Sequence, residues 1–267
     1  MLQPITDALL IQRIDMKNLL LCIFLLMAVG FPQKKKIKIF IAGDSTAANK
    51  EVKAFPETGW GMPFANFFDS TVTVDNRAKN GRSTRTFISE GLWQKLINDV
   101  HGGDYVLIQF GHNDEVPSKI GSYTPPDDYK ANLSRFVTET RNRKANPVLL
   151  TPVSRRQFDS AGRIKETHGI YSNLVREVAK QYNVPLIDID EKSKVLLQKF
   201  GAENSKLLFM QLEPGEHPNY PEGRNDNTHF NELGARKIAE LVLSGIKELH
   251  LELAERIRPP LEAKKTN

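Results

Sequence analysis

The residues best able to carry chemistry are a serine near the start of the chain and a histidine near its end. Ser45 lies in the segment Gly-Asp-Ser-Thr at 43–46, and His229 closes the segment Asp-Asn-Thr-His at 226–229. A serine hydroxyl becomes a nucleophile when a positioned base takes its proton, and histidine is the commonest such base. Asp226 lies three residues before His229, so in a turn its carboxylate can accept the Nδ1 proton and leave Nε2 free.

The elements that must position these residues alternate along the chain. Short apolar runs are followed by longer segments with apolar residues at helical spacing, which is typical of a parallel sheet with crossover helices. The predicted strands cover residues 37–42, 72–75, 105–110, 148–152 and 185–189. The predicted helices cover residues 84–100, 127–143, 167–182 and 231–250. The last helix carries an apolar stripe that is expected in the core, made of Leu233, Ile238, Leu241, Val242 and Ile246.

Polar segments follow each of the first three predicted strands. Ser45 comes after the first, Asn76 and residues 80–83 come after the second, and residues 111–114 come after the third. In an open parallel sheet, the loops that leave the carboxyl ends of the strands form the ligand crevice. Gly-Asp-Ser alone is more often a helix cap than a catalytic site, so the case for catalysis depends on the other segments.

Together, these segments resemble the four sequence blocks of the SGNH (GDSL) hydrolase superfamily, in the same order and after the same strands. The blocks are Gly-Asp-Ser at 43–45, Gly81, Gly111 with Asn113, and Asp226 with His229. Within the superfamily, residues 58–61, 81–87 and 104–114 resemble the rhamnogalacturonan acetylesterase family, and the likeness runs from about 37 to 250. The resemblance implies an ester hydrolase with a flavodoxin-like three-layer α/β/α sandwich around a parallel five-stranded sheet.

The resemblance also implies a role for each block. Ser45 is expected to attack the acetyl carbonyl, His229 to act as base and then acid, and Asp226 to orient His229. The oxyanion would be held by the backbone amides of Ser45 and Gly81 and by the side-chain amide of Asn113. Glycine at 81 would let the substrate approach that backbone amide closely. The two-step mechanism releases acetate and needs no metal or organic cofactor.

The expected substrate is an acetylated plant polysaccharide, most simply rhamnogalacturonan. Four residues are candidates for contacts with it: Trp60, Arg82, Arg155 and His168. An indole can stack on a sugar, although a tryptophan is more often core. Arginines at the rim of the crevice suit galacturonate carboxylates, and His168 lies in a loop that could line the crevice. Three alternatives remain open: an esterase for xylan or another carbohydrate, a GDSL lipase or lysophospholipase, and a non-catalytic carbohydrate-binding protein.

Other polar residues have simpler structural interpretations. Asp44 is expected to bond neighbouring loop amides, because an acid beside the nucleophile would repel the developing oxyanion. The resemblance makes His112 a scaffold residue. No metal site is expected, since Asp188, Asp190 and Asp226 lack the oxygen-rich spacing of a calcium loop.

Length and charge narrow the class of protein further. The chain has 267 residues and 40% hydrophobic content, which suits one catalytic domain, expected at 37–257. The formal net charge of +5 is concentrated near the ends, including the lysines at 34–36 and 38, so no nucleic-acid partner is expected. The sequence indicates no particular oligomeric state.

The first 30 residues are typical of an export signal. A cationic start at Met16 and Lys17 precedes an apolar run at 19–27 and a small-residue cleavage pattern at 28–30. Residues before Met16 are interpreted as an over-extended start. The protein is therefore expected to be secreted or periplasmic, without stable membrane insertion. Cys22 lies inside the apolar run with too few apolar residues before it for a lipoprotein anchor, and the mature chain would lack cysteine.

Overall fold

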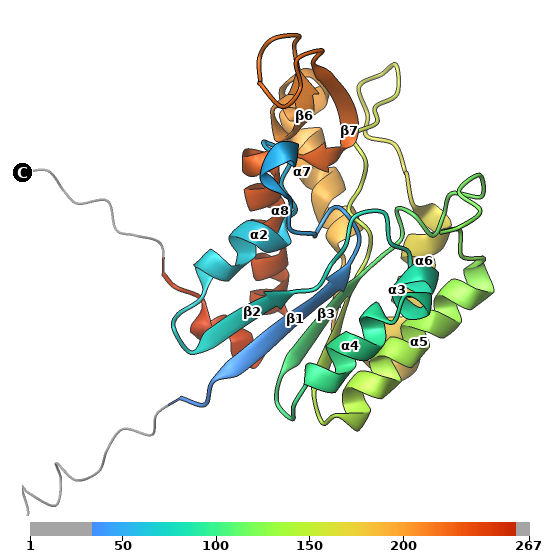
Figure 1. Ribbon diagram of the computed structural model, residues 1–267, viewed down its shortest axis with the longest axis vertical. Coiled ribbons are helices and arrows are strands. Elements are labelled where there is room, and N and C mark those ends of the chain that lie inside the picture. Colours follow the sequence, from blue (N-terminus) through green and yellow to red (C-terminus); the bar gives the residue numbers. More distant parts are fainter. Residues whose placement is uncertain (1–33, 260–267) are drawn as a thin grey trace, which may run out of the picture. The chain divides into compact units, whose positions relative to one another are not determined.

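Five parallel strands form the central sheet of the computed structural model, which describes residues 34–259 (Figure 1). They lie in the order β2-β1-β3-β4-β5. Their bounds are β1 Ile37–Gly43, β2 Val72–Asn76, β3 Tyr105–Gln109, β4 Asn146–Leu150 and β5 Leu186–Ile187. The predicted five-stranded parallel sheet is confirmed. The expected export signal and Cys22 lie outside the described residues.

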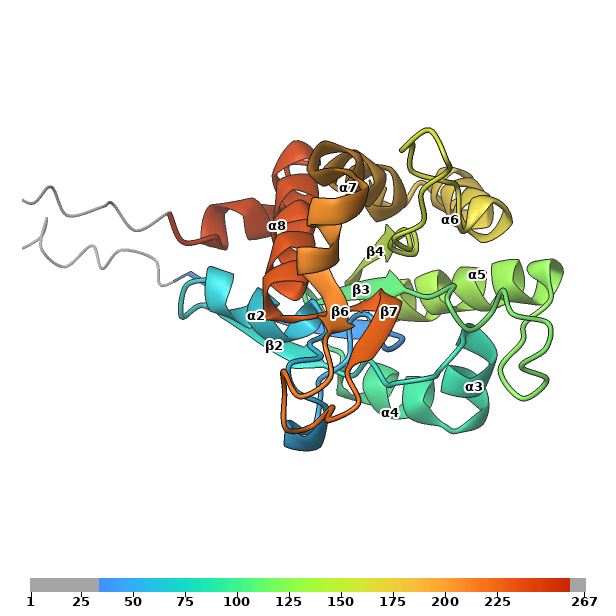
Figure 2. The ribbon, with the colours of Figure 1, turned by 90° about the horizontal axis from the view of Figure 1, so that it is seen from above.

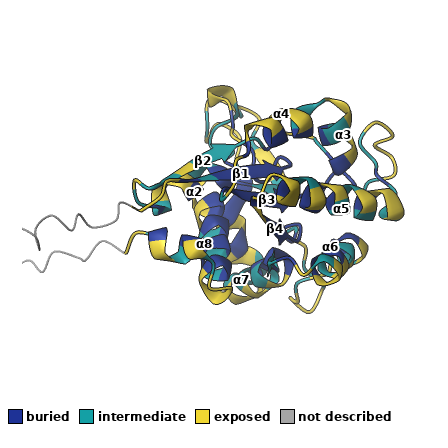
Figure 3. Ribbon diagram, turned by 90° about the horizontal axis from the view of Figure 1, so that it is seen from below, coloured by how far each residue is buried: buried dark blue, intermediate teal, exposed yellow. Residues whose placement is uncertain are grey.

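Helices cover both faces of this sheet, because strand side chains alternate between the two faces (Figure 2). Ile37, Ile39 and Ile41 pack in one apolar cluster, whereas Phe40 and Ala42 pack in the other. The first cluster lies under α2 Gly61–Phe64, α7 Ile189–Asn204 and α8 Glu232–Glu248. The second lies under α3 Thr84–Ser89, α4 Leu92–Asp99, α5 Pro126–Asn142 and α6 Gly169–Tyr182. The three-layer α/β/α sandwich is confirmed, and Figure 3 shows buried residues on the strands and the inward helix faces.

The element boundaries differ from the sequence prediction at several places. The expected helix at 84–100 is two helices, because Gly91 adopts a left-handed conformation with φ of 71° between α3 and α4. β5 ends before Asp188, whose side chain instead caps α7 by accepting from the backbone N–H of Glu191. In the apolar stripe of α8, Leu233 is 47% exposed and so lies outside the core.

An antiparallel hairpin at 209–230 is the largest departure from the prediction. None of the predicted strands covers this segment, but β6 Phe209–Leu212 pairs with β7 Arg224–Phe230. The sequence of β7 is Arg-Asn-Asp-Asn-Thr-His-Phe, which lacks the apolar alternation of a typical strand. This hairpin matters for function because β7 carries both Asp226 and His229.

Candidate active site

The turn after β1 fixes the position of Ser45. Asp44 is fully buried, and its Oδ1 accepts from the backbone N–H of Thr46 at 2.9 Å and from the Thr46 hydroxyl at 2.7 Å. Burial raises the pKa of Asp44. Gly43 has no room for a side chain, because a Cβ there would lie 2.9 Å from the carbonyl oxygen of Gln109. Asp44 thus bonds the turn, and Ser45 is left at its edge, 9% exposed.

Three side chains form a continuous hydrogen-bonded row that begins at Ser45. Its Oγ lies 2.9 Å from Nε2 of His229, and Nδ1 of His229 lies 2.8 Å from Oδ2 of Asp226. The other oxygen of Asp226 accepts from the backbone N–H groups of Thr228 at 2.8 Å and His229 at 3.0 Å. Residues 184 positions apart in the chain are therefore in direct contact.

The charge on Asp226 determines which atoms donate and which accept in the hydrogen bonds of this row. Burial raises its pKa, but hydrogen bonds from His229 and Arg224 outweigh burial and hold the pKa well below its usual range. An ionised Asp226 accepts the Nδ1 proton of His229, so Nε2 is free to accept from the Ser45 hydroxyl. The arrangement can activate a serine nucleophile.

The candidate oxyanion donors lie on the loops after β2 and β3. Asn113 is 5% exposed, and its Nδ2 donates to the carbonyl oxygen of Arg82 at 3.0 Å, while its Oδ1 accepts from Lys119 at 3.3 Å. The amide hydrogens of Asn113 therefore face the loop that holds Gly81. Gly81 has φ of 74°, and a Cβ built there would meet no atom within 4 Å. Glycine suits this position because it adopts a positive φ readily and leaves the backbone amide open to a substrate.

Lys50 joins the turn that carries Ser45 to the loop that carries Gly81, and sequence reasoning did not find it. Its side chain is fully buried, and its ammonium lies 2.7 Å from the Ser45 carbonyl oxygen, from Oδ1 of Asn80 and from Oε1 of Glu57. Burial lowers the pKa of Lys50. No local motif marks this lysine: Ser45 and Glu57 are near it in sequence, but Asn80 is 30 residues away and is brought to it by the fold.

Comparison with known proteins agrees with this geometry. The model of the GDSL-like lipase/acylhydrolase family matches residues 41–237. The rhamnogalacturonan acetylesterase RhgT of Bacillus subtilis (strain 168) is 44% identical over 224 residues, which cover 84% of this chain and 95% of that protein. The probable rhamnogalacturonan acetylesterase YesY of the same organism is 36% identical and covers 82% of this chain and 96% of that protein. The chain belongs to the GDSL-like family.

Solved structures support the fold of this GDSL-like chain. An acetylxylan esterase from Geobacillus stearothermophilus matches with a TM-score of 0.57 and 18% identity, covering 79% of this chain and 94% of that one. Protein YxiM from Bacillus subtilis matches with a TM-score of 0.70 and 24% identity over 82% of this chain. The match spans 58% of the YxiM chain. The fold is that of the SGNH hydrolases, and family membership makes this chain a carboxylic ester hydrolase.

Arg155 and His168 both lie in a network that adjoins the row of three side chains. Arg155 donates to Oγ1 of Thr228 at 3.0 Å and to Oε1 of Glu115 at 2.7 Å. The other oxygen of Glu115 lies 2.7 Å from Nδ1 of His168. Because Thr228 directly precedes His229, this network supports the hairpin that carries the histidine. His168 is only 2% exposed, so its contacts favour a supporting position over a place on the crevice surface.

The structure corrects the expectation for Trp60. Its side chain is fully buried, its Nε1 donates to Oε1 of Gln109 at 2.6 Å, and its ring packs edge-on against Phe64. No face of the indole is open for stacking on a sugar. Arg82, in contrast, is partly exposed and makes an ion pair of 2.9 Å with Glu90 beside a surface cleft.

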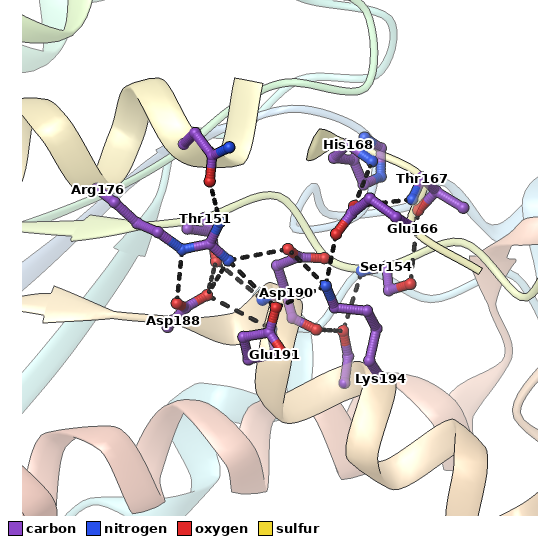
Figure 4. Close-up of polar contacts among 12 residues, drawn as sticks. Thr151, Ser154, Glu166, Thr167, His168, Arg176, Asp188, Asp190, Glu191 and Lys194 are labelled. Atoms are coloured by element: carbon purple, nitrogen blue, oxygen red, sulfur yellow. Dashed lines mark hydrogen bonds and ion pairs between the residues drawn. The ribbon is translucent and has the colours of Figure 1, made fainter. Parts of the chain in front are cut away.

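One cluster of carboxylates in the described residues has the spacing of a metal site. Glu166, Asp190 and Glu191 offer oxygens within 4.8 Å of one another. However, Figure 4 shows Lys194 among them, and its ammonium lies 2.7, 3.2 and 2.6 Å from these three carboxylates in turn. Arg176 adds a second cation at 3.0 Å from Asp190. These two cations offset part of the negative charge, and Glu166 also accepts from the backbone N–H of His168 at 2.8 Å.

Proposed function

We propose that this chain is a serine esterase that removes acetyl groups from rhamnogalacturonan. The observation that carries the proposal is the row from Ser45 Oγ through His229 to Asp226, with both links under 3 Å. Ser45 follows β1, and the loops after the neighbouring strands β2 and β3 carry Gly81 and Asn113, whose amides could reach the same edge of the sheet. In a GDSL-like ester hydrolase, this geometry supports Ser45 as the nucleophile, His229 as the base and Asp226 as the residue that orients it.

Acetyl transfer to the enzyme is the first half of the proposed reaction. The Ser45 oxygen attacks the acetyl carbonyl carbon while its proton moves to Nε2 of His229. The ionised Asp226 stabilises the imidazolium, and Asn113 with the backbone amides of Ser45 and Gly81 donates to the oxyanion. The carbon–oxygen bond to the sugar then breaks, and the sugar oxygen leaves with the proton held by His229.

Hydrolysis of the acetyl-serine is the second half. His229 takes a proton from a water molecule, whose oxygen attacks the acetyl carbon. When the bond to Ser45 breaks, the serine oxygen recovers its proton from His229, and acetate leaves. Each cycle consumes one water and one ester and restores the starting protonation of all three side chains.

The choice of substrate is supported by the relatives. RhgT and YesY are both named as rhamnogalacturonan acetylesterases, the second as a probable one, and both align over more than four fifths of this chain. The test compares acetate release from acetylated rhamnogalacturonan and from acetylated xylan. Faster release from the pectic polymer is expected. Faster release from xylan would identify acetylated xylan as the substrate and leave the proposed mechanism unchanged. Hydrolysis of a long-chain ester at the same rate as the acetylated polymer would favour a lipase.

We also propose that the enzyme is exported and loses residues 1–30. Within residues 34–259, none of the helices is long and apolar enough to cross a membrane. A polysaccharide is too large to enter a cell intact, so a deacetylase for it is useful outside the cytoplasm. N-terminal sequencing of the protein recovered from medium or periplasm should begin close to residue 31. A chain that still begins at Met16 in the cytoplasm would contradict export.

A further inference from the structure

A cleft of about 850 Å³ opens beside the loop that carries Gly81. Its walls come from residues 49–54, which follow the nucleophile turn, from residues 76–82 after β2, and from residues 90–95 at the start of α4. The volume lies within the roughly 300–1,000 Å³ that is usual for small-molecule sites. The amide side chains of Asn49, Asn76 and Asn80 are part of the lining. The side-chain N–H groups of Asn49 and Asn80 can bond sugar hydroxyls, whereas those of Asn76 already donate to Ala47 and Asn49.

The charge of this cleft is strongly one-sided. Five basic side chains and two acidic ones line it. Carboxylates neutralise three of the cations: Lys53 pairs with Glu51, Arg77 with Asp75 and Asp99, and Arg82 with Glu90. A second polar cleft, beside β7, is lined by three basic and three acidic side chains. Of these two polar clefts in the described residues, the first is the one with an excess of positive charge.

Lys79 and Lys95 are the source of that excess. Both are exposed, and within residues 34–259 neither ammonium makes a hydrogen bond or an ion pair. Lys79 has only a weak Coulomb attraction to the exposed Glu51. Two unpaired lysines in one cleft favour an anionic ligand, and no aromatic residue lines the cleft to stack on a nucleic-acid base.

Asn80 connects this cleft to the catalytic turn. It lines the cleft, and its Oδ1 accepts from Lys50, whose ammonium also donates to the carbonyl oxygen of Ser45. Gly81, the proposed oxyanion donor, is the next residue. A sugar in the cleft would therefore be a close neighbour of the sugar whose ester reaches Ser45.

We propose that this cleft is a subsite for a uronic-acid residue of the substrate chain, with Lys79 and Lys95 binding its carboxylate. The inference rests on the proposed function and deepens it, since it assigns a place to a uronic-acid residue of the same chain that carries the acetyl ester. Both lysines are exposed, so each contact is worth about 0.5–0.9 kcal/mol, within the range of exposed ion pairs, or about two- to fivefold in affinity. The pair should contribute about five- to twentyfold.

Binding of unacetylated tetragalacturonate, measured by titration calorimetry, tests the subsite without any catalysis. The variant Lys79→Gln/Lys95→Gln is compared with Lys144→Gln/Lys180→Gln, a control that removes two exposed lysines at the far edge of the sheet. The first variant should bind about five- to twentyfold more weakly than wild type, and the control should match wild type. Methyl-esterified tetragalacturonate should bind wild type as weakly as the acid binds the first variant.

Deacetylation of an acetylated rhamnogalacturonan oligosaccharide separates the subsite from the proposed function. The ratio of kcat/KM for this substrate to that for p-nitrophenyl acetate should fall about five- to twentyfold in Lys79→Gln/Lys95→Gln, through KM, and stay constant in the control. If tetragalacturonate binding depends on the two lysines but the enzyme leaves rhamnogalacturonan acetylated, the subsite is supported and rhamnogalacturonan is rejected as the substrate. Equal tetragalacturonate affinity in wild type and variant, or tighter binding of single-stranded DNA than of tetragalacturonate, would overturn the subsite.

Discussion

Replacing Lys50 by methionine should impair both the stability and the turnover of the enzyme. The ammonium of Lys50 makes three contacts of 2.7 Å, and its removal leaves the Ser45 carbonyl, the Asn80 amide oxygen and the Glu57 carboxylate without their cation. Removing one partner of a buried charged pair costs about 3–5 kcal/mol. Glu57 is 14% exposed on its side chain, so water can solvate part of its charge. We therefore expect a loss of about 3 kcal/mol in the free energy of unfolding.

The effect of Lys50→Met on turnover follows from the atoms that Lys50 links. Without the ammonium, the turn of Ser45 and the loop of Gly81 lose their common anchor, and the backbone donors to the oxyanion shift. Complete loss of one such donor lowers kcat about a hundred- to a thousandfold, so a partial shift should lower it about ten- to a hundredfold. KM for a small ester should change little, because no substrate contact is removed.

Urea unfolding and p-nitrophenyl acetate kinetics, both at a temperature where all variants are folded, measure these two effects. Glu57→Gln is the matched variant, since it keeps an oxygen that can accept from Lys50 and removes only the charge. It should lose about 1 kcal/mol of stability and keep most of its kcat. A Lys50→Met enzyme that loses stability but keeps wild-type kcat would refute the positioning role, and one that loses neither would refute the buried network.

Four other predictions concern Asp226, the two candidate oxyanion donors Asn113 and Gly81, and Trp60. The pKa of Asp226 is lower in the folded protein than in the unfolded chain. Its carboxylate therefore stabilises the fold above the unfolded pKa, and this contribution is lost as the pH falls through the folded pKa. In urea unfolding, the stability of Asp226→Asn should differ most from that of wild type above about pH 5 and progressively less below about pH 4. Asn113→Ala should lower kcat for p-nitrophenyl acetate about a hundred- to a thousandfold, and a change under about threefold would remove it from the oxyanion site. Gly81→Ala should lose about 1 kcal/mol of unfolding free energy, since alanine is strained at φ of 74° although its methyl group has space. Trp60→Phe should lower the melting temperature but leave KM for the polysaccharide unchanged, and a raised KM would restore a sugar contact for the indole.

The contact between Ser45, His229 and Asp226 could be predicted because each of these residues carries a local signature. Ser45 follows the first strand directly, and the spacing of Asp226 and His229 lets the carboxylate return to the imidazole. Parallel strands with apolar runs are also visible in the sequence, so the sandwich was predictable. The β6–β7 hairpin was not predictable, because β7 has no apolar pattern of its own. It is held by pairing with β6 and by the hydrogen bond from Arg155 to Thr228.

The contacts around the row depend on packing that no single segment reveals. Trp60 has the residue type of a sugar-stacking platform, but its place against Phe64 and Gln109 is decided by the fold. Lys50 is one of many lysines, and only the folding of its own segment, residues 45–57, against Asn80 makes it a buried anchor. The same holds for the cleft at Lys79, because its walls join residues that are far apart in the chain.

The proposed role of Ser45 is that of a nucleophile activated by His229. Its most direct test is inactivation by a fluorophosphonate, followed by mass spectrometry of peptides from wild type, Ser45→Ala and His229→Ala. This role of Ser45 predicts one label per chain on the peptide that contains Ser45 and loss of acetate release in proportion to labelling. It also predicts no labelling of Ser45→Ala and very slow labelling of His229→Ala. A label on another residue, or acetate release by Ser45→Ala at the wild-type rate, would contradict it.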